Sequence, residues 1–449
     1  MTLTPMTRHW TLLLSLLLLS GSAFAQQATD LRYTNDLQYY RPPGQAGLNV
    51  FEVPKQAYAS RGGIEVGVPF DGLKVHVGGD FAIQFQGLSQ SNDSLNLVDL
   101  APNFALPTAN LNLDVQIADG MRMHLRTYLS SRNHTEAYVK GGYFQVDNLD
   151  FLKEDFLSGV MDVARFRFGM DEINYGDTHF RRSDNAAVMY NPFVGNYIMD
   201  SFTTEPFAEA TVLSNGFVGV AGLSNGRLNQ SPVSGDNGVA VYGKLGYDNQ
   251  INDMFRARLT GSVYHSTADG TRDYLYGGDR AGARYYNVLE VIDEARPSNF
   301  LPRFNPGFPY QTAIQINPFV QYDVADNVGV EFFGVFERSM GGGEVELASG
   351  MVNRGAFTQL GGELLVRFGP ERDFYVGGRY NAVNGSAVED GADQEITRFN
   401  VGGGWFLTNN VLAKVEYVNQ SYDGEAYIGN AQFEGAEFSG VVVEAAISF

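Results

Sequence analysis

The feature that most constrains this chain is an alternation of apolar and polar residues that returns many times along its length. The stretch 121–129 reads MRMHLRTYL, in which apolar residues alternate with Arg122, His124 and Arg126. A period of two residues is typical of a β-strand with two unlike faces. The same alternation recurs in 73–86, 255–263, 374–381 and 398–405. We therefore expect many β-strands, each with one apolar and one polar face.

The N-terminus has the features of an export signal. Arg8 precedes an apolar run, WTLLLSLLLL, and Ala23-Phe24-Ala25 forms a small-x-small cleavage site. The apolar run is too short for a membrane-spanning helix, which needs about 20 residues. The chain has no cysteine, so neither a lipid-modified cysteine nor a disulfide framework is expected. Residues 1–25 are predicted to be a cleaved signal peptide, and the mature chain is expected to begin at Gln26.

The C-terminus, VVVEAAISF, is the most specific of the alternating segments. Counting back by twos from Phe449 gives only apolar residues as far as Val441. This segment resembles the closing strand of a bacterial outer-membrane β-barrel, which the barrel-assembly machinery recognises. The alternative is an ordinary soluble strand that happens to end the protein. The resemblance favours the barrel and implies an outer-membrane location.

The connections between the alternating segments fall into two kinds. Short polar turns such as Ala118-Asp119-Gly120 alternate with long connections such as 267–312, a pattern typical of outer-membrane barrels. We predict an all-β, closed antiparallel transmembrane barrel of about sixteen strands within 72–449, after a lead-in segment at 26–71. The expected strands are 73–87, 105–118, 121–131, 135–147, 160–170, 206–213, 217–224, 238–248, 254–266, 313–323, 328–338, 357–368, 373–383, 396–407, 411–420 and 437–449.

A barrel of this kind sorts the two faces of each strand. Its outside must be apolar to lie in lipid, and 16–18 strands leave an aqueous channel inside. We therefore expect the basic residues of the polar faces to line the pore: Arg122, His124, Arg126, Arg165 and Arg167. The alternative is that such residues pair with inward carboxylates and only hold the wall in shape. The candidate carboxylates are Asp80, Asp114, Glu363 and Glu416.

The long connection 171–204 departs from the alternating pattern. Its stretch THFRRSDN contains His179, Arg181, Arg182 and Asp184, and an aromatic run follows at Tyr190, Phe193 and Tyr197. It resembles the third long loop of sixteen-stranded porins, which folds into the barrel and narrows it. We expect 178–185 inside the barrel, with the two arginines facing the wall that carries Arg122 and Arg167. The alternative is a solvated loop outside.

The order RFRFGMDEINYGDTHFRRSDN, residues 165–185, also resembles the porin O/P-like group of Gram-negative outer-membrane channels. The resemblance implies a trimeric, substrate-filtering channel in which basic residues handle anions. The net charge of -20 departs from this pattern. Much of the excess acid lies in the long connections, including Glu290 and Asp393. Remote charges are screened beyond about 10 Å at 0.1 M salt, so a weak preference for anions is expected.

The sequence contains no pattern typical of an enzyme. GxSxG, HExxH and nucleotide-binding glycine motifs are absent, and the six histidines are scattered. No cofactor, metal site or nucleic-acid partner is expected. The predicted function is a porin that lets small hydrophilic solutes diffuse through the outer membrane, phosphate-like or phosphorylated ones among them. Its expected partners are lipid, lipopolysaccharide and two further copies in a homotrimer. The alternative is a non-conducting barrel with a structural or adhesion role.

Overall fold

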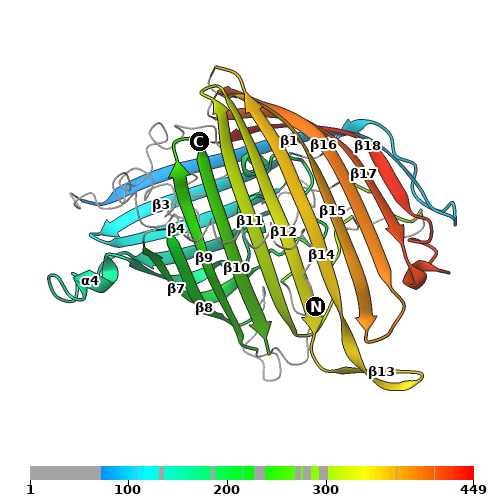
Figure 1. Ribbon diagram of the computed structural model, residues 1–449, viewed down its shortest axis with the longest axis horizontal. Helices are drawn as coiled ribbons and strands as arrows, with labels where there is room; N and C mark the ends of the chain where they lie inside the picture. Colours follow the sequence, from blue (N-terminus) through cyan, green and yellow to red (C-terminus); the bar gives the residue numbers. More distant parts are fainter. Residues whose placement is uncertain are drawn as a thin grey trace, which may run out of the picture.

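The computed structural model describes residues 72–449, except for 106, 131–135, 184–187, 215, 227–237, 268–274, 277–284, 293–301, 371, 409 and 449. The signal peptide, the lead-in segment 26–71, Asp184 and Phe449 therefore lie outside the described residues. One antiparallel sheet of eighteen strands dominates the structure (Figure 1). Two of its strands, β2 (Asn103–Phe104) and β13 (Glu344–Leu347), are short additions. The other sixteen close into a barrel.

All sixteen strands predicted from the alternation are present, with bounds that shift by a few residues. They are β1 (Lys74–Ser91), β3 (Thr108–Ala118), β4 (Met121–Ser130), β5 (Glu136–Val146), β6 (Ala164–Glu172), β7 (Thr204–Ser214), β8 (Phe217–Ser224), β9 (Ala240–Asn252), β10 (Phe255–Ser266), β11 (Gln311–Ala325), β12 (Val328–Gly341), β14 (Gly350–Phe368), β15 (Phe374–Val388), β16 (Gln394–Thr408), β17 (Val411–Asp423) and β18 (Glu437–Ser448). The largest shift is at β14, whose first residues extend the wall as a hairpin with β13.

The barrel closes where the last strand meets the first. β18 pairs antiparallel with β1 from Ser91 opposite Glu437 to Asp80 opposite Ser448. The remaining pairs follow chain order, so every strand of the wall has two neighbours. This is the closure expected from the apolar alternation of the C-terminal segment.

The two faces of the wall differ as the alternation predicted. In β10 the side chains of Arg256, Arg258 and Thr260 are buried, whereas those of Leu259 and Val263, at alternate positions of the same strand, are exposed. β4 behaves in the same way, with its three basic side chains turned inward. Since successive side chains of a strand point to opposite faces, a shift of register by one residue would place these charges on the outer face.

Three stacked rings lie on the outer face near the turn that joins β14 and β15. Phe374 stacks on Phe368 with ring centroids 5.7 Å apart and on Trp405 at 5.6 Å. All three rings are more than a third exposed. They lie directly opposite one another in the strand register.

In the residues that the structure describes, helical structure is confined to the connections between strands. The α-helix α4 (Ser158–Met161) and the 3₁₀ helices η2 (Thr178–Phe180), η3 (Val188–Tyr190) and η4 (Glu425–Tyr427) are single turns. α4 belongs to the connection between β5 and β6, which projects from one end of the barrel (Figure 1). None of the helices in the described part of the chain is long and apolar enough to cross a membrane.

Candidate pore-lining site

The connection between β6 and β7 lies inside the barrel. Almost all of its described residues from 173 to 203 are buried. Backbone amides along the loop donate hydrogen bonds to inward side chains of the wall, among them Asp177 to Asn317 on β11, Val194 to Glu416 on β17, Ile198 to Asn381 on β15 and Met199 to Gln359 on β14. The loop is therefore fixed along the inner face of the wall. A loop above the rim could not make these hydrogen bonds.

Arg181 of this loop shares a buried carboxylate with the wall. Its guanidinium lies 3.0 Å from one oxygen of Glu363 on β14, and Arg379 on β15 lies 2.7 Å from the other. All three side chains are at most 1 % exposed. Arg181 also packs over the ring of Phe333 on β12, at 5.0 Å. These contacts hold the centre of the loop against the β12–β15 part of the wall.

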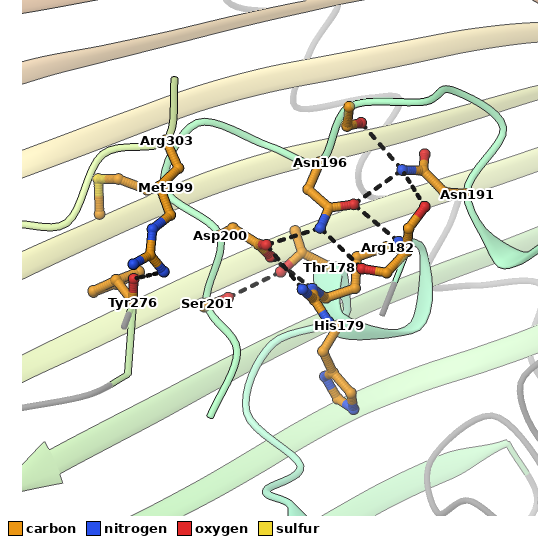
Figure 2. A network of polar contacts seen from close by, with 12 residues as sticks. Thr178, His179, Arg182, Asn191, Asn196, Met199, Asp200, Ser201, Tyr276 and Arg303 are labelled. Atoms are coloured by element: carbon orange, nitrogen blue, oxygen red, sulfur yellow. Dashed lines mark hydrogen bonds and ion pairs between the residues drawn. The ribbon is translucent and has the colours of Figure 1, made fainter. Parts of the chain in front are cut away.

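Arg182 turns to a partner within its own loop (Figure 2). Its Nε lies 2.8 Å from a carboxylate oxygen of Asp200, and its guanidinium stacks over Phe202 at 3.8 Å. Asn196 donates to the other oxygen of Asp200 at 2.9 Å and accepts a bond from the Ser183 amide at 2.9 Å. The arginine therefore fixes the loop's two limbs to each other.

His179 does not join this network. Figure 2 shows its ring pointing away from Arg182 and Asp200. Its Nδ1 lies 3.1 Å from the carbonyl oxygen of Tyr175, and its ring packs on Phe180 at 3.9 Å. The histidine contributes to the packing of the loop's first turn.

A second ion-pair cluster anchors the start of the loop. Asp177 lies 2.9 Å from Lys244 on β9 and 3.1 Å from Arg258 on β10. Lys244 also donates to the side-chain oxygen of Asn174 and to the Gly176 carbonyl oxygen. Burial alone would raise the pKa of the Asp177 carboxyl, but Lys244 and Arg258 hold that pKa below its usual range.

The basic residues on the wall formed by β4 and β6 are paired as well. Arg122 and Arg165 share Asp147, at 2.6 and 3.2 Å. Arg126 lies 3.2 Å from Glu172, and Arg167 lies 2.7 Å from Glu209. His124 Nδ1 lies 2.5 Å from Asp114 on the adjacent strand. These contacts agree with the alternative given in the sequence analysis, in which inward arginines pair with inward carboxylates.

One sequence prediction about the site is wrong. Arg181 and Arg182 were expected to face the wall of Arg122 and Arg167 across a narrow gap. Instead Arg181 reaches Glu363 and Arg182 folds back on Asp200. The reason is charge: a buried guanidinium needs a carboxylate, and these two carboxylates hold the loop's arginines. Five further arginines on the polar faces of the wall strands are also buried: Arg256, Arg258, Arg367, Arg379 and Arg398.

A second loop inside the barrel was missed. The connection between β10 and β11 was expected as an acidic outer loop, but its Glu290 is 2 % exposed and its Tyr276 and Tyr285 are buried. Tyr285 donates to Glu416 on β17 at 2.7 Å. The clustering of four tyrosines at 274–286 was the available signal, because tyrosine can pack and donate at once.

The two loops are joined to each other and to one wall carboxylate. The Phe202 amide donates to the Leu275 carbonyl oxygen, and Phe304 donates to Ile198, both at 2.8 Å. Tyr175 of the first loop and Tyr276 of the second both donate to Glu337 on β12, at 3.2 and 2.8 Å. Two linked loops therefore lie in the interior, where the sequence analysis predicted that one loop would narrow the aqueous channel.

The described residues contain no group of three or more histidines, cysteines, aspartates or glutamates arranged to hold a metal ion.

The comparisons with known proteins give structural matches only. No family model matches the chain, and no curated protein matches its sequence. Among solved structures, the outer membrane channel DcaP of Acinetobacter baumannii is 12% identical, with a TM-score of 0.48 over 86% of this chain and 100% of that one. OmpT of Vibrio cholerae is 10% identical at 0.48, over 84% and 98%. An anion-selective porin from Comamonas acidovorans is 10% identical at 0.49, over 84% and 100%. At these values the similarity indicates neither a ligand nor a solute.

Proposed function

We propose that this protein is an outer-membrane porin that lets small hydrophilic solutes diffuse passively across the membrane. The observation that carries the proposal is the sorting of side chains in a closed sixteen-stranded wall. The outer face is apolar, as at Leu364 and Val376, which are 53% and 50% exposed. The inner face carries the charges. A closed barrel with this sorting satisfies its backbone hydrogen bonds and can lie in lipid.

The proposal includes a weak preference for anions, phosphate-like or phosphorylated solutes among them. Its support is the gathering of Arg122, Arg126, Arg165 and Arg167 on neighbouring strands. Each of these arginines has a carboxylate within 3.2 Å. The field that they present to a solute is therefore smaller than four free charges would give, and the selectivity should be correspondingly modest.

The proposed cellular setting is the outer membrane of a Gram-negative cell. It includes export by a cleaved signal peptide, insertion by the barrel-assembly machinery through the strand that ends at Phe449, contact with lipid and lipopolysaccharide, and assembly into a homotrimer. No cofactor and no catalytic activity are part of the proposal.

Conductance in planar bilayers tests the channel. Purified protein should give stepwise currents in KCl, and the reversal potential in a salt gradient should indicate weak anion preference. Arg181→Ala with Arg182→Ala should move that potential toward cations, since the carboxylates of Glu363 and Asp200 would lose loop partners. Arg372→Ala is the matched control, because Arg372 pairs with Asp323 in the turns outside the lumen. An unchanged reversal potential in the double variant would mean that Arg181 and Arg182 do not determine the charge selectivity of the channel.

The filled interior favours one alternative function. Arg181, Glu363 and Arg379 are almost fully buried, and linked loops cross the barrel. A barrel closed in this way would serve as a structural or adhesion protein. Absence of conductance steps over a range of voltages, in protein that has folded and inserted, would support this alternative over the porin.

A further inference from the structure

The first strand of the wall extends beyond the last strand at the seam where the barrel closes. β1 pairs with β3 from Lys74 onward, but its pairing with β18 begins only at Asp80, opposite Ser448. Among the described residues, no strand lies beside the backbone of 74–78 on the side away from β3. We name this side of the backbone of 74–78 the open edge. An unpaired edge of this kind is a site at which another strand can add.

The outer face beside the open edge is apolar and exposed. Leu73 is 67% exposed, Val75 54% and Val77 53%. These three residues occupy alternate positions of β1 and therefore share one face of the wall. In an antiparallel sheet, side chains on directly opposite residues stabilise the pair when both are apolar. A strand that covered this edge would therefore need an apolar residue at every second position.

The direction of the backbone groups along β1 follows from one hydrogen bond. The carbonyl oxygen of Gln84 accepts from the Ala105 amide, on the side of β1 where β2 and β3 lie. Successive residues of a strand direct their backbone groups to opposite sides, and no register shift interrupts β1. Even-numbered residues therefore bond toward β3. Val75 and Val77 direct their N–H and C=O groups toward the open edge.

The sequence just before the open edge has the pattern that such an edge requires. Residues 64–71, which lie outside the described residues, read IEVGVPFD, and every second residue from Ile64 to Phe70 is apolar. Asp71-Gly72 follows, and Asp-Gly is typical of the two-residue turn of a β-hairpin. Gly72 has a φ of 132°, in the region that favours glycine. The pattern predicts a strand that turns back along β1.

We propose that residues 64–70 add to the open edge of β1 as a short further strand, in line with β18. The turn is Asp71-Gly72, and the added strand runs antiparallel to β1. The cross-strand pairs on the outer face are then apolar on both sides: Phe70 with Leu73, Val68 with Val75, and Val66 with Val77. The added strand satisfies backbone groups of β1 that face no other strand of the described residues.

The backbone phase of β1 and the one proline of the segment both agree with this register. In a hairpin with a two-residue turn, the residues on either side of the turn, Phe70 and Leu73, exchange hydrogen bonds. Odd-numbered residues of β1 must therefore face the added strand, and Val75 does so. Pro69 then lies opposite Lys74, in a pair that exchanges no hydrogen bonds. A proline in a strand needs such a position, because it has no N–H to donate.

Proximity favours this segment over a strand from another molecule. Two residues join the segment to the open edge, and a short linker gives an effective concentration in the millimolar range. A second copy of the chain or a separate protein would have to displace the segment. Its docking would also fix the preceding residues, 26–63, beside the seam at this end of the barrel.

Because the chain contains no cysteine, a pair of new thiols can test the register. In Val68→Cys with Val75→Cys, the two Cα atoms should lie about 5.5 Å apart, a separation that a disulfide spans. Gly67→Cys with Val75→Cys is the matched control, because the loop is almost as long but the two side chains point to opposite faces. In the full-length mature protein in lipid vesicles, mild oxidation should close the first pair within one chain at least about tenfold faster than the second.

Hydrogen exchange provides a measurement that needs no cysteine. In the native protein the amides of Val75 and Val77 should be protected, as that of His76 is by its direction toward β3. Gly72→Val should remove this protection, because a β-branched residue is strained at positive φ. A Cβ at Gly72 would meet no atom within 4 Å, so the change acts through the backbone. At about fivefold for each neutral hydrogen bond, the two amides should exchange roughly twenty-fivefold faster.

Gly429→Val is the matched control for this variant. Gly429 is an exposed glycine with a φ of 76° and no atom within 4 Å of a Cβ, and it lies in the connection between β17 and β18. The same substitution there should leave exchange at Val75 and Val77 unchanged. Exchange at His76 should stay slow in both variants.

Two results would overturn the added strand. One is an equal rate of disulfide formation in the two cysteine pairs, as expected if the segment is not in register. The other is a covalent dimer in place of closure within one chain, which would assign the open edge to a second copy. If a variant does not fold, exchange in the native protein decides: amides of Val75 and Val77 as slow as that of His76 support the added strand, and unprotected amides overturn it. None of these measurements depends on conductance.

Discussion

Replacing Glu363 by glutamine should loosen the loop between β6 and β7. In the native protein each carboxylate oxygen of Glu363 holds one arginine, Arg181 of the loop and Arg379 of the wall. An amide offers a single oxygen, so one guanidinium loses its partner. Breaking a buried ion pair by removing one partner costs about 3–5 kcal/mol. Only Arg181 belongs to the loop. We therefore take the lower end of this range, about 3 kcal/mol, as the loss of free energy that docks the loop on the wall.

Because the chain contains no cysteine, a single thiol can report this opening. Ser183 is fully buried two residues after Arg181, and Ser183→Cys should react slowly with a small thiol reagent. A loss of about 3 kcal/mol raises the population of the locally open state roughly a hundredfold. The labelling rate of Cys at this position should rise by the same factor in the Glu363→Gln background. A bulky reagent applied from outside should remain slow, since the loop lies inside the barrel.

Glu331→Gln is the control for this experiment. Glu331 on β12 pairs with Arg367 on β14 at 2.8 Å, and both belong to the wall. The same chemical change there should destabilise the barrel without speeding the labelling at position 183. Labelling rates that differ by less than threefold between the native protein and Glu363→Gln would refute the view that this carboxylate docks the loop.

Three further changes test other parts of the structure. Lys244→Met should cost about 3 kcal/mol of loop docking, because Asp177 would keep only Arg258. In the native protein the lowered pKa of Asp177 preserves its ion pairs until the pH falls through that lowered value, so the loop should open only in acid. Since the thiolate is the reacting form, the labelling rate at position 183 is divided at each pH by that of a free small thiol, and this ratio should stay constant until the loop opens. Leu364→Arg on the outer face should lower the free energy of unfolding in lipid by about 2–4 kcal/mol, measured by urea titration in vesicles, whereas a change within 0.5 kcal/mol would contradict the assignment of that face to lipid. Phe374→Ala should cost about 1–3 kcal/mol in the same titration, since Phe374 stacks on two rings, and Phe368→Ala should cost about half as much because it loses one stack of the pair.

The strands could be predicted because the surroundings of a barrel wall impose a simple rule. Residues such as Leu259 and Val263 alternate with Arg258 and Thr260 because one face meets an apolar medium and the other does not. The same rule predicted the inward position of the arginines. The alternation does not specify how long a strand is. The extension of β14 back to Gly350, where it pairs with β13, therefore could not be predicted.

The pairing of charges inside the barrel could not be predicted from the sequence. Arg181 and Glu363 are 182 residues apart, and the strand on which the partner lies depends on the path of a loop without periodicity. The burial of Tyr276 and Tyr285 depends on the same path. The aromatic residues Phe193 and Tyr197 were a usable sign that the first loop packs inside, because both are buried against the guanidinium group of Arg379. The second loop contained a similar sign in its tyrosines.

The pairing of β1 with β18 has a consequence for how the protein must be made. The side chain of Ser448 donates to Asp80, 368 residues earlier in the chain, so the sheet keeps two open edges until its final strand is in place. Bringing such distant segments together is entropically expensive and slow. During that interval the unpaired edges can add strands from other molecules, which is a route to aggregation. The chain should therefore depend on a chaperone that covers its unpaired edges before the barrel closes. Shortening β18 should increase aggregation of the unassembled chain more than it alters the assembled barrel.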